Sequence, residues 1–558
     1  MRNFFVSSLS VITLLAISSC SKLGPLSADN FTVTPNPLET QGGQVPATIN
    51  GVFPAKYMKS KAVVTVTPEL RYGNGQVAKG RSAVFQGENV MGNNQTISYK
   101  VGGRYTMKTS FDYLPEMQQS DMYLTFDARL GKKKVQVPAV KVATGVLATS
   151  ELYRQTLMNA GGCIAPDSFE RVKAMKTEAN IKFLVNQANL RKSELKNNSV
   201  QEFVQMLRQI NIDREGLNLR NVEVRAYASP EGGFSFNDKL AEKRKGSSES
   251  YVKRQLNDAK LGGSSIDARY TAQDWDGFKR LVQASNIQDK DVILRVLEMY
   301  KDPEQREQQI RNMSEGFREL ANGILPELRR SRLIINYETI GRSDEQIKEQ
   351  YSIDPARLSP DELLYFASLE ASAAGKEAIY KKTAEIYDKD YRAFNNLAAL
   401  AFNEGNMRRA KDFIQTALRK NPKAPEAYAN LALIDLRNGE LQSAENNLSK
   451  AIDANGFGEV IGNLNIAKGN YATAVKNFGD ASSNSAALAQ ILNKDYAAAV
   501  ATLKGIKHRD SLTDYLMAVA LNRQGNTATA KDYLQKATAA NPELATYAAK
   551  DLEFSNYR

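Results

Sequence analysis

Histidine, tryptophan and cysteine are almost absent from this sequence. Its 558 residues include one histidine, His508, one tryptophan, Trp275, and two cysteines. A structural zinc site needs about four cysteine or histidine ligands, and a histidine-based catalytic triad would have to use His508. The sequence also lacks the GxxxxGK(S/T) loop and the GxGxxG turn that bind nucleotide phosphates. We therefore expect no metal site, no cofactor and no enzymatic activity.

A large excess of one charge is missing as well. The chain has 74 basic and 62 acidic residues, a formal net charge of +12, and 42% of its residues are apolar. This composition is typical of folded protein and not of a disordered chain. The basic excess is too small to indicate nucleic-acid binding, and the length predicts three or four domains.

A transmembrane helix is not expected, because no stretch approaches 18 apolar residues. The apolar stretch at residues 4–17 follows Arg2 and has the length of a secretory signal. It ends in Ile17-Ser18-Ser19-Cys20, which resembles the lipobox of bacterial lipoproteins. The resemblance implies a signal peptide over residues 1–19 and acylation of Cys20, so the N-terminal lipid would make the membrane a partner.

An ordinary signal peptide with an incidental cysteine is the other interpretation of this segment. Acylation would leave Cys163 as the sole thiol, so that no intramolecular disulfide could form. Residues 20–30 are the expected tether, and no acidic residue precedes Asp29 in it. Surface-exported lipoproteins of Bacteroides-like bacteria tend to carry acids there, so the resemblance implies an outer-membrane protein that faces the periplasm.

Residues 31–150 have the pattern of a β-sandwich of Ig-like size. About seven runs of β-branched or aromatic residues, such as 62–66, 96–101 and 122–126, are separated by Gly, Asn and Pro clusters. That number of runs in this length predicts two packed sheets. Nothing in the region indicates chemistry, so we expect a spacer or a protein-contact module.

Residues 151–340 alternate between strand and helix patterns. Strands are predicted over 180–185, 222–227, 266–270 and 332–337, and helices over 199–210 and 237–256. Ser199 is the expected N-cap of the first helix. A helical insert over about 272–328 separates the last two strands.

The second of these strands leads into a motif with a known counterpart. Tyr227-Ala228-Ser229-Pro230-Glu231-Gly232, followed by Asn237, Leu240, Ala241 and Arg244, resembles the peptidoglycan-associating motif of OmpA-like domains. In that family a strand ends in an Asp-containing turn, and a helix with Asn-x-x-Leu-Ser-x-x-Arg-Ala follows. The resemblance implies an α/β OmpA-like domain over residues 151–340.

The same resemblance implies a site for the diaminopimelate of the peptidoglycan stem peptide. In the family an Asp in the turn and an Arg on the helix hold its ammonium and carboxylate groups. Arg244 keeps the position of the Arg, Ser229 replaces the Asp, and Glu231 is two residues further on. The candidate peptidoglycan-binding residues are therefore Arg244, Ser229, Glu231 and Asn237. Two hypotheses stay open, a weak pocket built on Arg244 and an inherited fold without a ligand.

Two further features favour structural roles. Trp275, flanked by Asp274 and Asp276, is typical of a core anchor beside a capped helix start. The basic run at 329–332 is typical of a solvated turn or of arginines braced against a sheet, and it resembles the Arg-rich closing turn of the OmpA-like family.

Residues 357–550 contain an internal repeat of 34 residues. Adding 34 to the numbers of Phe394, Ala398, Gly405 and Ala410 gives Tyr428, Ala432, Gly439 and Ala444. An aromatic, two small residues and a Gly at this period are typical of tetratricopeptide (TPR) repeats. The alanines let two helices approach closely, and Gly405 turns the chain between them. We expect five or six helix pairs and a concave face that offers a surface to a partner protein.

These features together predict a multidomain envelope lipoprotein of the Bacteroidota with a β-sandwich, an OmpA-like domain and a TPR solenoid. We expect a scaffold that links the membrane, peptidoglycan and a partner protein on the TPR face. The alternative is a pure protein-interaction subunit of an outer-membrane secretion or assembly complex, whose OmpA-like domain no longer binds peptidoglycan. A cell-wall enzyme is disfavoured, because no acid pair is clustered and Cys163 has no base among its neighbours.

Overall fold

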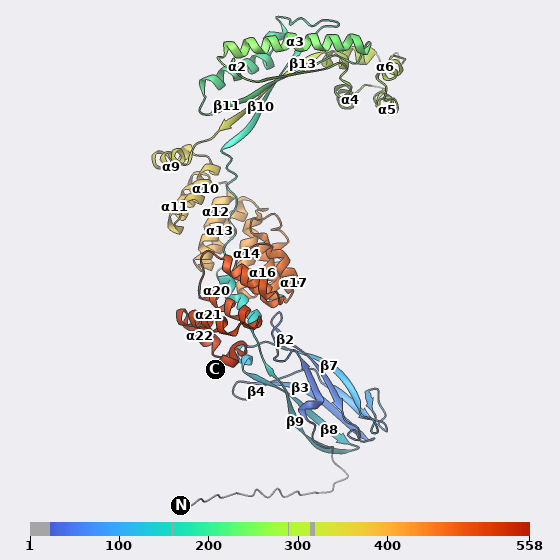
Figure 1. Cartoon of the computed structure of the whole chain (residues 1–558), viewed down its shortest axis with the longest axis vertical. Coiled ribbons are helices and arrows are strands. Elements are labelled where there is room, and N and C mark those ends of the chain that lie inside the picture. The colour runs from blue at the N-terminus through green and yellow to red at the C-terminus, as the bar shows by residue number, and fades with distance from the viewer. Residues whose placement is uncertain (1–22, 159, 288, 313–317, 558) are drawn as a thin grey trace, which may run out of the picture. The chain divides into compact units, whose positions relative to one another are not determined.

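The computed structural model describes residues 23–557 except 159, 288 and 313–317. The chain forms two compact units (Figure 1): one joins the residues up to Asp167 with Ala367–Arg558, and the other is Ser168–Phe366. The second unit is therefore an insertion within the first. The sequence placed the start of the central domain at residue 151. The structure places it at Ser168, because residues 149–167 pack against the C-terminal helices instead.

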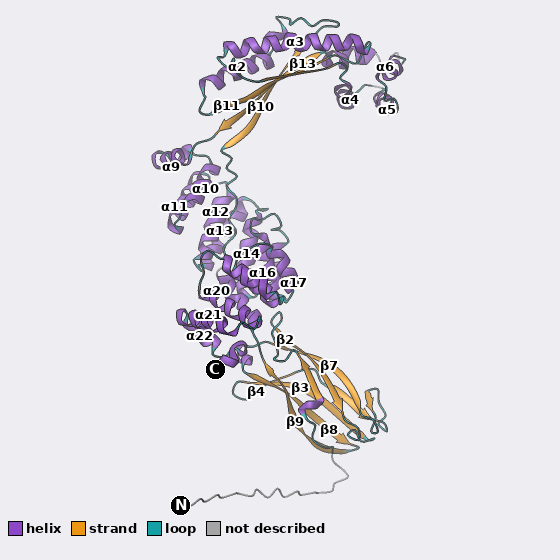
Figure 2. Cartoon of the chain, viewed as in Figure 1, coloured by secondary structure: helices purple, strands orange, loops and turns teal. Residues whose placement is uncertain are grey.

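The first unit begins with a β-sandwich (Figure 2). Its strands are β1 (Phe31–Thr34), β2 (Gln44–Phe53), β3 (Ala62–Tyr72), β4 (Gln76–Lys79), β5 (Ala83–Gly87), β6 (Gln95–Ile97), β7 (Gly103–Asp112), β8 (Ser120–Leu130) and β9 (Lys133–Gly145). One sheet has the order β1-β2-β7, and the other has the order β6-β5-β3-β8-β9 with β4 on β3. Inward-facing residues alternate with exposed ones along the long strands, and the inward residues of both sheets form one core.

The strand predicted over 96–101 is shorter in the structure. It ends at Ile97, because Ser98 and Gly102 bridge across a tight turn in which Gly102 has a φ of 76°. A Cβ on Gly102 would lie 2.3 Å from the carbonyl oxygen of Phe53, so only glycine fits this position.

A segment that we call the strap, residues 149–167, follows the sandwich. It contains a 3-10 helix, Thr149–Leu152, and the short helix α1, Tyr153–Met158. Its remaining described residues form neither helix nor strand. The strap is the part of the chain that the sequence assigned to the central domain.

The central unit contains a four-stranded sheet with the order β10-β13-β11-β12. The strands are β10 (Val172–Lys182), β11 (Leu217–Tyr227), β12 (Ile266–Thr271) and β13 (Arg330–Ile340). β13 is antiparallel to both of its neighbours, and β11 is parallel to β12. The order of strands and helices along the chain is the one that the sequence predicted.

Two helices, α2 (Asn198–Ile212) and α3 (Phe234–Asp258), cover one face of this sheet (Figure 1). Phe203 and Leu207 of α2 and Val252 of α3 are fully buried against the strands. The N-cap of α2 is Asn197, whose side chain accepts from the N–H of Val200, and not Ser199 as predicted.

The other face of the sheet carries charged side chains. Arg225 of β11 lies opposite Arg332 of β13 on one side and opposite Arg269 of β12 on the other. Like charges directly opposite each other destabilise a sheet, and acids offset them here. Asp267 accepts from Arg225 at 2.7 Å and from Arg269 at 3.0 Å, while Glu178 accepts from Arg332 at 2.6 Å.

The predicted helical insert is present between β12 and β13. It comprises α4 (Trp275–Ala284), α5 (Lys290–Met299), α6 (Pro303–Arg311), a π-helical turn (Leu320–Ile324) and α8 (Leu325–Leu328). Phe278, Ile293 and Leu328 belong to a small core of its own. Helices α9 (Asp344–Ile353) and α10 (Pro360–Leu369) follow β13.

Helices of the solenoid make up the rest of the first unit. They are α11 (Ala373–Ile386), α12 (Tyr391–Asn403), α13 (Met407–Lys420), α14 (Pro425–Asn438), α15 (Leu441–Leu448), α16 (Phe457–Ala467), α17 (Tyr471–Phe478), α18 (Asn484–Leu492), α19 (Tyr496–Gly505), α20 (Ser511–Arg523), α21 (Thr527–Ala540) and α22 (Pro542–Ala548).

Successive helices from α12 to α21 pair as TPR-like repeats. Gly405 and Gly439, which are 34 residues apart, both have a φ of 78° and turn the chain between the helices of a pair. Ala410 and Ala444 are fully buried at the positions that the repeat predicted. The shorter pairs α16–α17 and α18–α19 follow, as expected from the closer spacing of their glycines and alanines.

Candidate functional site

The turn between β11 and α3 is shaped by Asn237. Its side-chain amide donates to three carbonyl oxygens of the turn, those of Ser229 at 3.1 Å, Glu231 at 3.0 Å and Gly232 at 3.2 Å. Gly232 has a φ of 92°, which favours glycine. Asn237 therefore acts on the main chain of the turn, and its side chain is 3% exposed.

Arg244 lies beneath this turn and is only 1% exposed. Its Nε donates to the carbonyl of Gln187 at 3.0 Å, Nη1 to that of Tyr227 at 2.9 Å and Nη2 to that of Leu184 at 3.2 Å. The guanidinium also lies 4.9 Å from the centre of the Phe183 ring. Burial, and secondarily Arg329, lowers the pKa of Arg244 to about 10, while Glu231 opposes this shift. Every nitrogen of the guanidinium is thus engaged with the protein's own main chain or its neighbours.

Ser229 and Glu231 are tied to each other and to the basic run. Ser229 Oγ donates to Glu231 Oε1 at 3.0 Å, and Arg329 Nη2 lies 2.6 Å from the same oxygen. Ser229 is 5% exposed. The acid that the sequence proposed as a partner for a ligand ammonium is therefore neutralised by Arg329.

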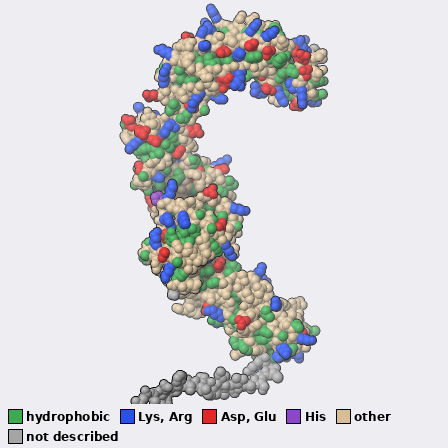
Figure 3. Space-filling model, in the orientation of Figure 1, with side chains coloured by type: hydrophobic (Ala, Val, Ile, Leu, Met, Phe, Trp, Pro, Cys, Tyr) green, Lys and Arg blue, Asp and Glu red, His purple; other side chains and the backbone are tan. Residues whose placement is uncertain are grey.

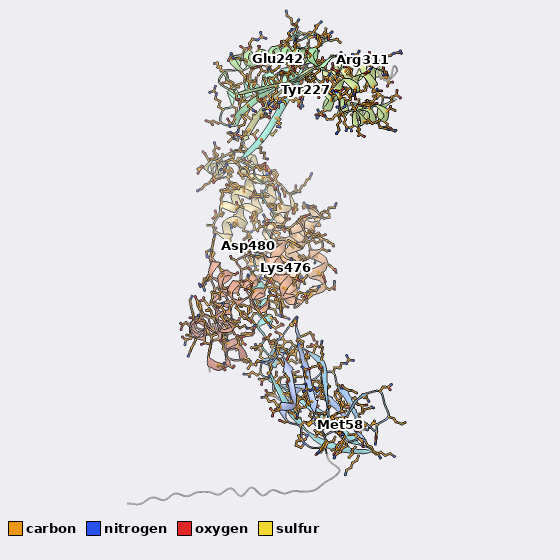
Figure 4. The ribbon with its side chains drawn as sticks, turned by 45° about the vertical axis from the view of Figure 1, so that its right-hand side comes forward. Met58, Tyr227, Glu242, Arg311, Lys476 and Asp480 are labelled. Atoms are coloured by element: carbon orange, nitrogen blue, oxygen red, sulfur yellow. The ribbon has the colours of Figure 1, made fainter. Side chains whose placement is uncertain are left out.

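The helical insert closes the turn from the other side. The N–H of Gly232 donates to Glu307 Oε1 of α6 at 2.6 Å, and Gln273 Nε2 donates to the carbonyl of Gly232 at 3.1 Å. Glu307 is itself paired with Arg311 at 2.6 Å. Tyr227 and Arg311 are labelled in Figure 4 near the turn and the insert. Glu307 therefore already accepts the hydrogen bond from Gly232 that the carboxylate of a ligand would need.

The basic run and Trp275 have structural partners. Arg330 pairs with Asp274 at 3.1 Å, and Arg332 pairs with Glu178. Asp274 also caps α4 by accepting from the N–H of Gly277. Trp275 packs against the core of the insert. These contacts are those of braced arginines and of a core anchor.

The concave face of the solenoid holds the strap. Asn396 of α12 accepts from the N–H of Ala165 at 2.8 Å and donates to its carbonyl at 3.3 Å. Asn430 of α14 accepts from the N–H of Cys163 at 2.6 Å and donates to its carbonyl at 2.9 Å. The two asparagines are 34 residues apart, so equivalent positions of successive repeats bind alternate residues of the strap.

Further side chains of the inner helices bind the main chain of the strap. Asn395 donates to the carbonyl of Cys163 at 2.9 Å, and Arg392 donates to that of Asp167 at 2.8 Å. Arg437 donates to the carbonyls of Leu157 and Met158, both at 2.9 Å. Because these bonds go to main-chain groups, they depend on the path of the strap, helical at Leu157 and Met158 and irregular at Cys163 and Asp167, more than on its sequence.

Apolar packing fixes the sequence of the strap at a few positions. Leu152, Tyr153, Leu157 and Cys163 are buried members of the core of the solenoid. A Cβ on Gly162 would lie 2.7 Å from Ala399 Cα, so the strap passes too close to α12 for any side chain there. Burial, with the negative charges of Glu426 and Glu459, raises the pKa of the Cys163 thiol to about 12. This cysteine is an unreactive core residue.

Along α12 and α14 the concave face is already filled by the strap. The expectation that this face offers a surface to a partner protein stays a prediction for the rest of the solenoid. A signal for this was present in the sequence: Asn396 and Asn430 share a repeat position that faces the groove. Residues 161–166 have the composition of a linker, so the sequence did not indicate that they bind in this groove.

Other sequence predictions find less in the structure. Cys20, the predicted acylation site, lies outside the described residues. Among residues 23–557 that the structure describes, no helix is long and apolar enough to cross a membrane. In the same residues, no group of three or more His, Cys, Asp or Glu side chains is placed to hold a metal ion.

Comparisons with known proteins found likeness to solved structures only. No protein-family model and no curated protein matches the chain. A tetratricopeptide repeat protein from Parabacteroides merdae is 15% identical with a TM-score of 0.28, over 38% of this chain and 91% of its own. YrrB, described as a TPR protein with an unusual peptide-binding site, is 19% identical with a TM-score of 0.21, over 37% and 100%.

The Cut9–Hcn1 hetero-tetramer of the APC/C is 12% identical with a TM-score of 0.29, over 62% of this chain and 73% of its own. At these TM-scores the argument for TPR-like repeats rests on the 34-residue period and on the paired helices described above. The chain is a multidomain protein with a sheet-rich N-terminal region and a C-terminal region of TPR-like repeats.

Proposed function

We propose that the protein is a lipid-anchored interaction scaffold of the bacterial outer membrane, and that its OmpA-like central unit no longer binds peptidoglycan. The resemblance of residues 17–20 to a lipobox supports the anchor, and the TPR-like repeats support the role in protein–protein interaction. The partner would be a component of an outer-membrane secretion or assembly complex. Because the strap occupies part of the concave face, the partner is expected on the outer helices or on the central unit.

A single observation carries the choice between scaffold and peptidoglycan tether. Arg244, the residue that would grip the carboxylate of a stem peptide, is buried, and its three nitrogens donate to main-chain carbonyls. Releasing it for a ligand would break these three hydrogen bonds of a buried charged group, each worth about 1.5–3 kcal/mol. The turn above it is closed as well, because Glu307 holds the N–H of Gly232.

Sedimentation with purified sacculi tests this choice. The protein that comprises residues 21–558 should stay in the supernatant, both when sacculi are added and when they are left out. Glu307→Ala, which frees the N–H of Gly232, should stay there too, as should its control Glu304→Ala, an exposed acid on the same helix. If the unaltered protein pellets with the sacculi, the hypothesis of peptidoglycan binding is supported and the proposal is wrong. Pelleting of Glu307→Ala alone would show that the turn still binds peptidoglycan and is blocked by the insert.

The anchor has its own test. Cys20→Ala should move the protein from the membrane fraction to the soluble fraction of the cell. Two results together would contradict the lipoprotein hypothesis. The variant would stay in the membrane, and most of the unaltered protein would still carry its signal peptide. The result is independent of the sacculus experiment, because that experiment uses protein without the acylated residue.

A further inference from the structure

We infer that one end of the β-sandwich, formed by residues 54–61, 88–94, 98–102 and 131–132, docks on the surface of an anionic phospholipid bilayer. We call these residues the basic end. The inference adds a second membrane contact to the proposed anchor at Cys20, and only its argument about tether length rests on that anchor.

The loops of the basic end form one continuous surface. Residues 54–61 lie at its centre, and three main-chain hydrogen bonds join the other segments to them. The N–H of Asn89 donates to the carbonyl of Ser60 at 2.8 Å, and that of Gly131 donates to Lys61 at 2.9 Å. The N–H of Lys56 donates to the carbonyl of Tyr99 at 2.6 Å. Figure 4 labels Met58, which is buried beneath this surface.

The charge of this surface is strongly one-sided. It carries five lysines against a single acid, Glu88; the lysines are Lys56, Lys59, Lys61, Lys100 and Lys132. Lys133 and Lys134 follow directly at the start of β9, and Lys134 has Asp127 as a partner at 3.5 Å. Basic side chains are visible at the lower edge of the sandwich in Figure 3. Clustered lysines near a membrane are attracted to anionic headgroups.

Two apolar side chains project from the same loops. Met91 is fully exposed, and Val101 is 74% exposed. Exposed apolar groups beside lysines suit the boundary between headgroups and acyl chains, where the apolar part is buried and the cations stay in the headgroup layer. A soluble protein partner with an acidic surface would use the lysines but gain less from the two protruding apolar side chains.

The route of the chain places the proposed lipid at this end. Phe31, at the start of β1, pairs with Gly51, two residues before β2 ends at the basic end. Leu23 and Leu26 are buried in the core of the sandwich. Leu23 is three positions after Cys20, and three residues span at most about 11 Å. The expected tether of residues 20–30 is therefore anchored to the sandwich from Leu23 onward, and a lipid on Cys20 would hold the sandwich against the bilayer.

The opposite end of the sandwich is covered by the solenoid. Gln41 Nε2 donates to the carbonyl of Gly469, and Tyr471 Oη donates to that of Thr40. Within this unit the basic end is thus the end of the sandwich that is left for a membrane.

Vesicle sedimentation of the unacylated protein, residues 21–558, tests the surface without the anchor. It should bind vesicles that contain phosphatidylglycerol and not vesicles of phosphatidylcholine alone, and high salt should weaken the binding. Each lysine near a bilayer contributes about a fivefold gain in partitioning. The triple change Lys61→Glu, Lys132→Glu and Lys133→Glu should therefore lower binding at least about 100-fold.

The matched control reverses three charges elsewhere on the sandwich, with Lys79→Glu, Arg81→Glu and Lys108→Glu, and should change binding far less. Met91→Trp should show blue-shifted emission on phosphatidylglycerol vesicles, with the unaltered protein, whose sole tryptophan is Trp275, as the blank. Equal binding to both vesicle types, or equal loss in both triple variants, would overturn the inference. When the membrane fraction is washed with high salt, which weakens the contact of the basic end, the release of Cys20→Ala or its retention bears on the anchor alone.

Discussion

The turn at Ser229 and the concave face of the solenoid are both filled by other parts of the same chain, but with different chemistry. The turn is held by charged groups, since Glu307 accepts from Gly232 and Arg329 pairs with Glu231. In the concave face, side-chain amides and two arginines, Arg392 and Arg437, bind the main chain of the strap, and buried apolar side chains pack beside them. The first closure joins carboxylates to an arginine and a main-chain N–H, whereas the bonds of the second run from side-chain amides and arginines to main-chain groups of the strap.

The comparison shows two ways in which one chain can fill its own surfaces. At the turn, Arg244 is buried and donates to the main chain around it. In the groove, the repeats still bind an extended polypeptide, and the chain itself supplies that polypeptide. We expect the four predictions below to separate these cases, from the largest effect to the smallest.

Arg244→Ala should lower the free energy of unfolding of the central unit by about 3–5 kcal/mol, because a buried guanidinium loses three hydrogen bonds to main-chain carbonyls. Denaturant unfolding followed by the fluorescence of Trp275, which lies in this unit, measures the change. Arg254→Ala, an exposed arginine on the same helix, should have an effect within about 0.5 kcal/mol. Unchanged stability in Arg244→Ala would mean that the guanidinium is available to a ligand.

Asn430→Ala should destabilise the sandwich–solenoid unit by about 2–4 kcal/mol, since the N–H and the carbonyl of Cys163 both lose a buried partner. Circular dichroism during urea unfolding reports the helices of this unit. Asn446→Ala, an exposed asparagine on α15, serves as the control. An equal effect of the two changes would contradict the role of the asparagines as clamps of the strap.

Gly162→Val should push the strap away from α12 and cost about 1–3 kcal/mol by overpacking. The neighbouring Gly161→Val is the matched control, because a Cβ at Gly161 meets nothing within 4 Å. Cys163 reports the outcome as the sole thiol of residues 21–558, and its rate of labelling by a thiol reagent should rise in the first variant only. Equal rates would show that the strap is loosely held.

Lowering the pH should change the free energy of unfolding of the two units in different ways, with a smaller effect than the three substitutions above. Hydrogen bonds from Arg225, and secondarily Arg269, hold the pKa of Asp267 at about 2. A carboxyl with a lowered pKa stabilises the fold above its unfolded pKa of about 3.9 and loses this contribution as the pH falls towards 2. Burial instead raises the pKa of Glu459 in the solenoid, so its protonation on mild acidification favours the folded state.

The central unit should therefore lose stability between about pH 4 and pH 2, and Asp267→Asn should flatten this loss. Urea unfolding at several pH values gives both responses in one protein, when Trp275 fluorescence follows the central unit and labelling of Cys163 by a pyridyl disulfide, which reacts with thiols in acid, follows the strap. A parallel decline of both signals in the variant and the unaltered chain would contradict the assignment to Asp267.

The sequence predicted those parts of the molecule that follow a local rule. Hydrophobic periodicity and the 34-residue spacing located the helix pairs, and the buried Ala410 and the left-handed Gly405 lie where the repeat requires them. Alternating strand and helix patterns gave the order of elements in the central unit. These signals are local because each arises from one helix face or one strand face.

The closures of both surfaces could not be predicted in the same way. Glu307 lies 75 residues from Gly232, and Cys163 lies 267 residues from Asn430. No periodic pattern marks an irregular segment such as the strap. The sequence alone also does not distinguish a buried arginine from one that binds a ligand. The motif around Ser229 therefore predicted a turn correctly but gave no indication of which groups fill it. Its role in peptidoglycan binding stays a prediction until the sacculus experiment is done.

The strap also dictates when the protein can finish folding during its synthesis. The sandwich and the strap are made early, but Tyr547 Oη donates to the carbonyl of Ala148 across 399 positions of the chain. The side chains that complete the first unit therefore emerge only after the whole inserted unit has been made. Until then the apolar face of α1 has no partner, and a nascent or truncated chain exposes it to aggregation. Loss of the last helices would for this reason destabilise the N-terminal part of the unit as well as the C-terminal part.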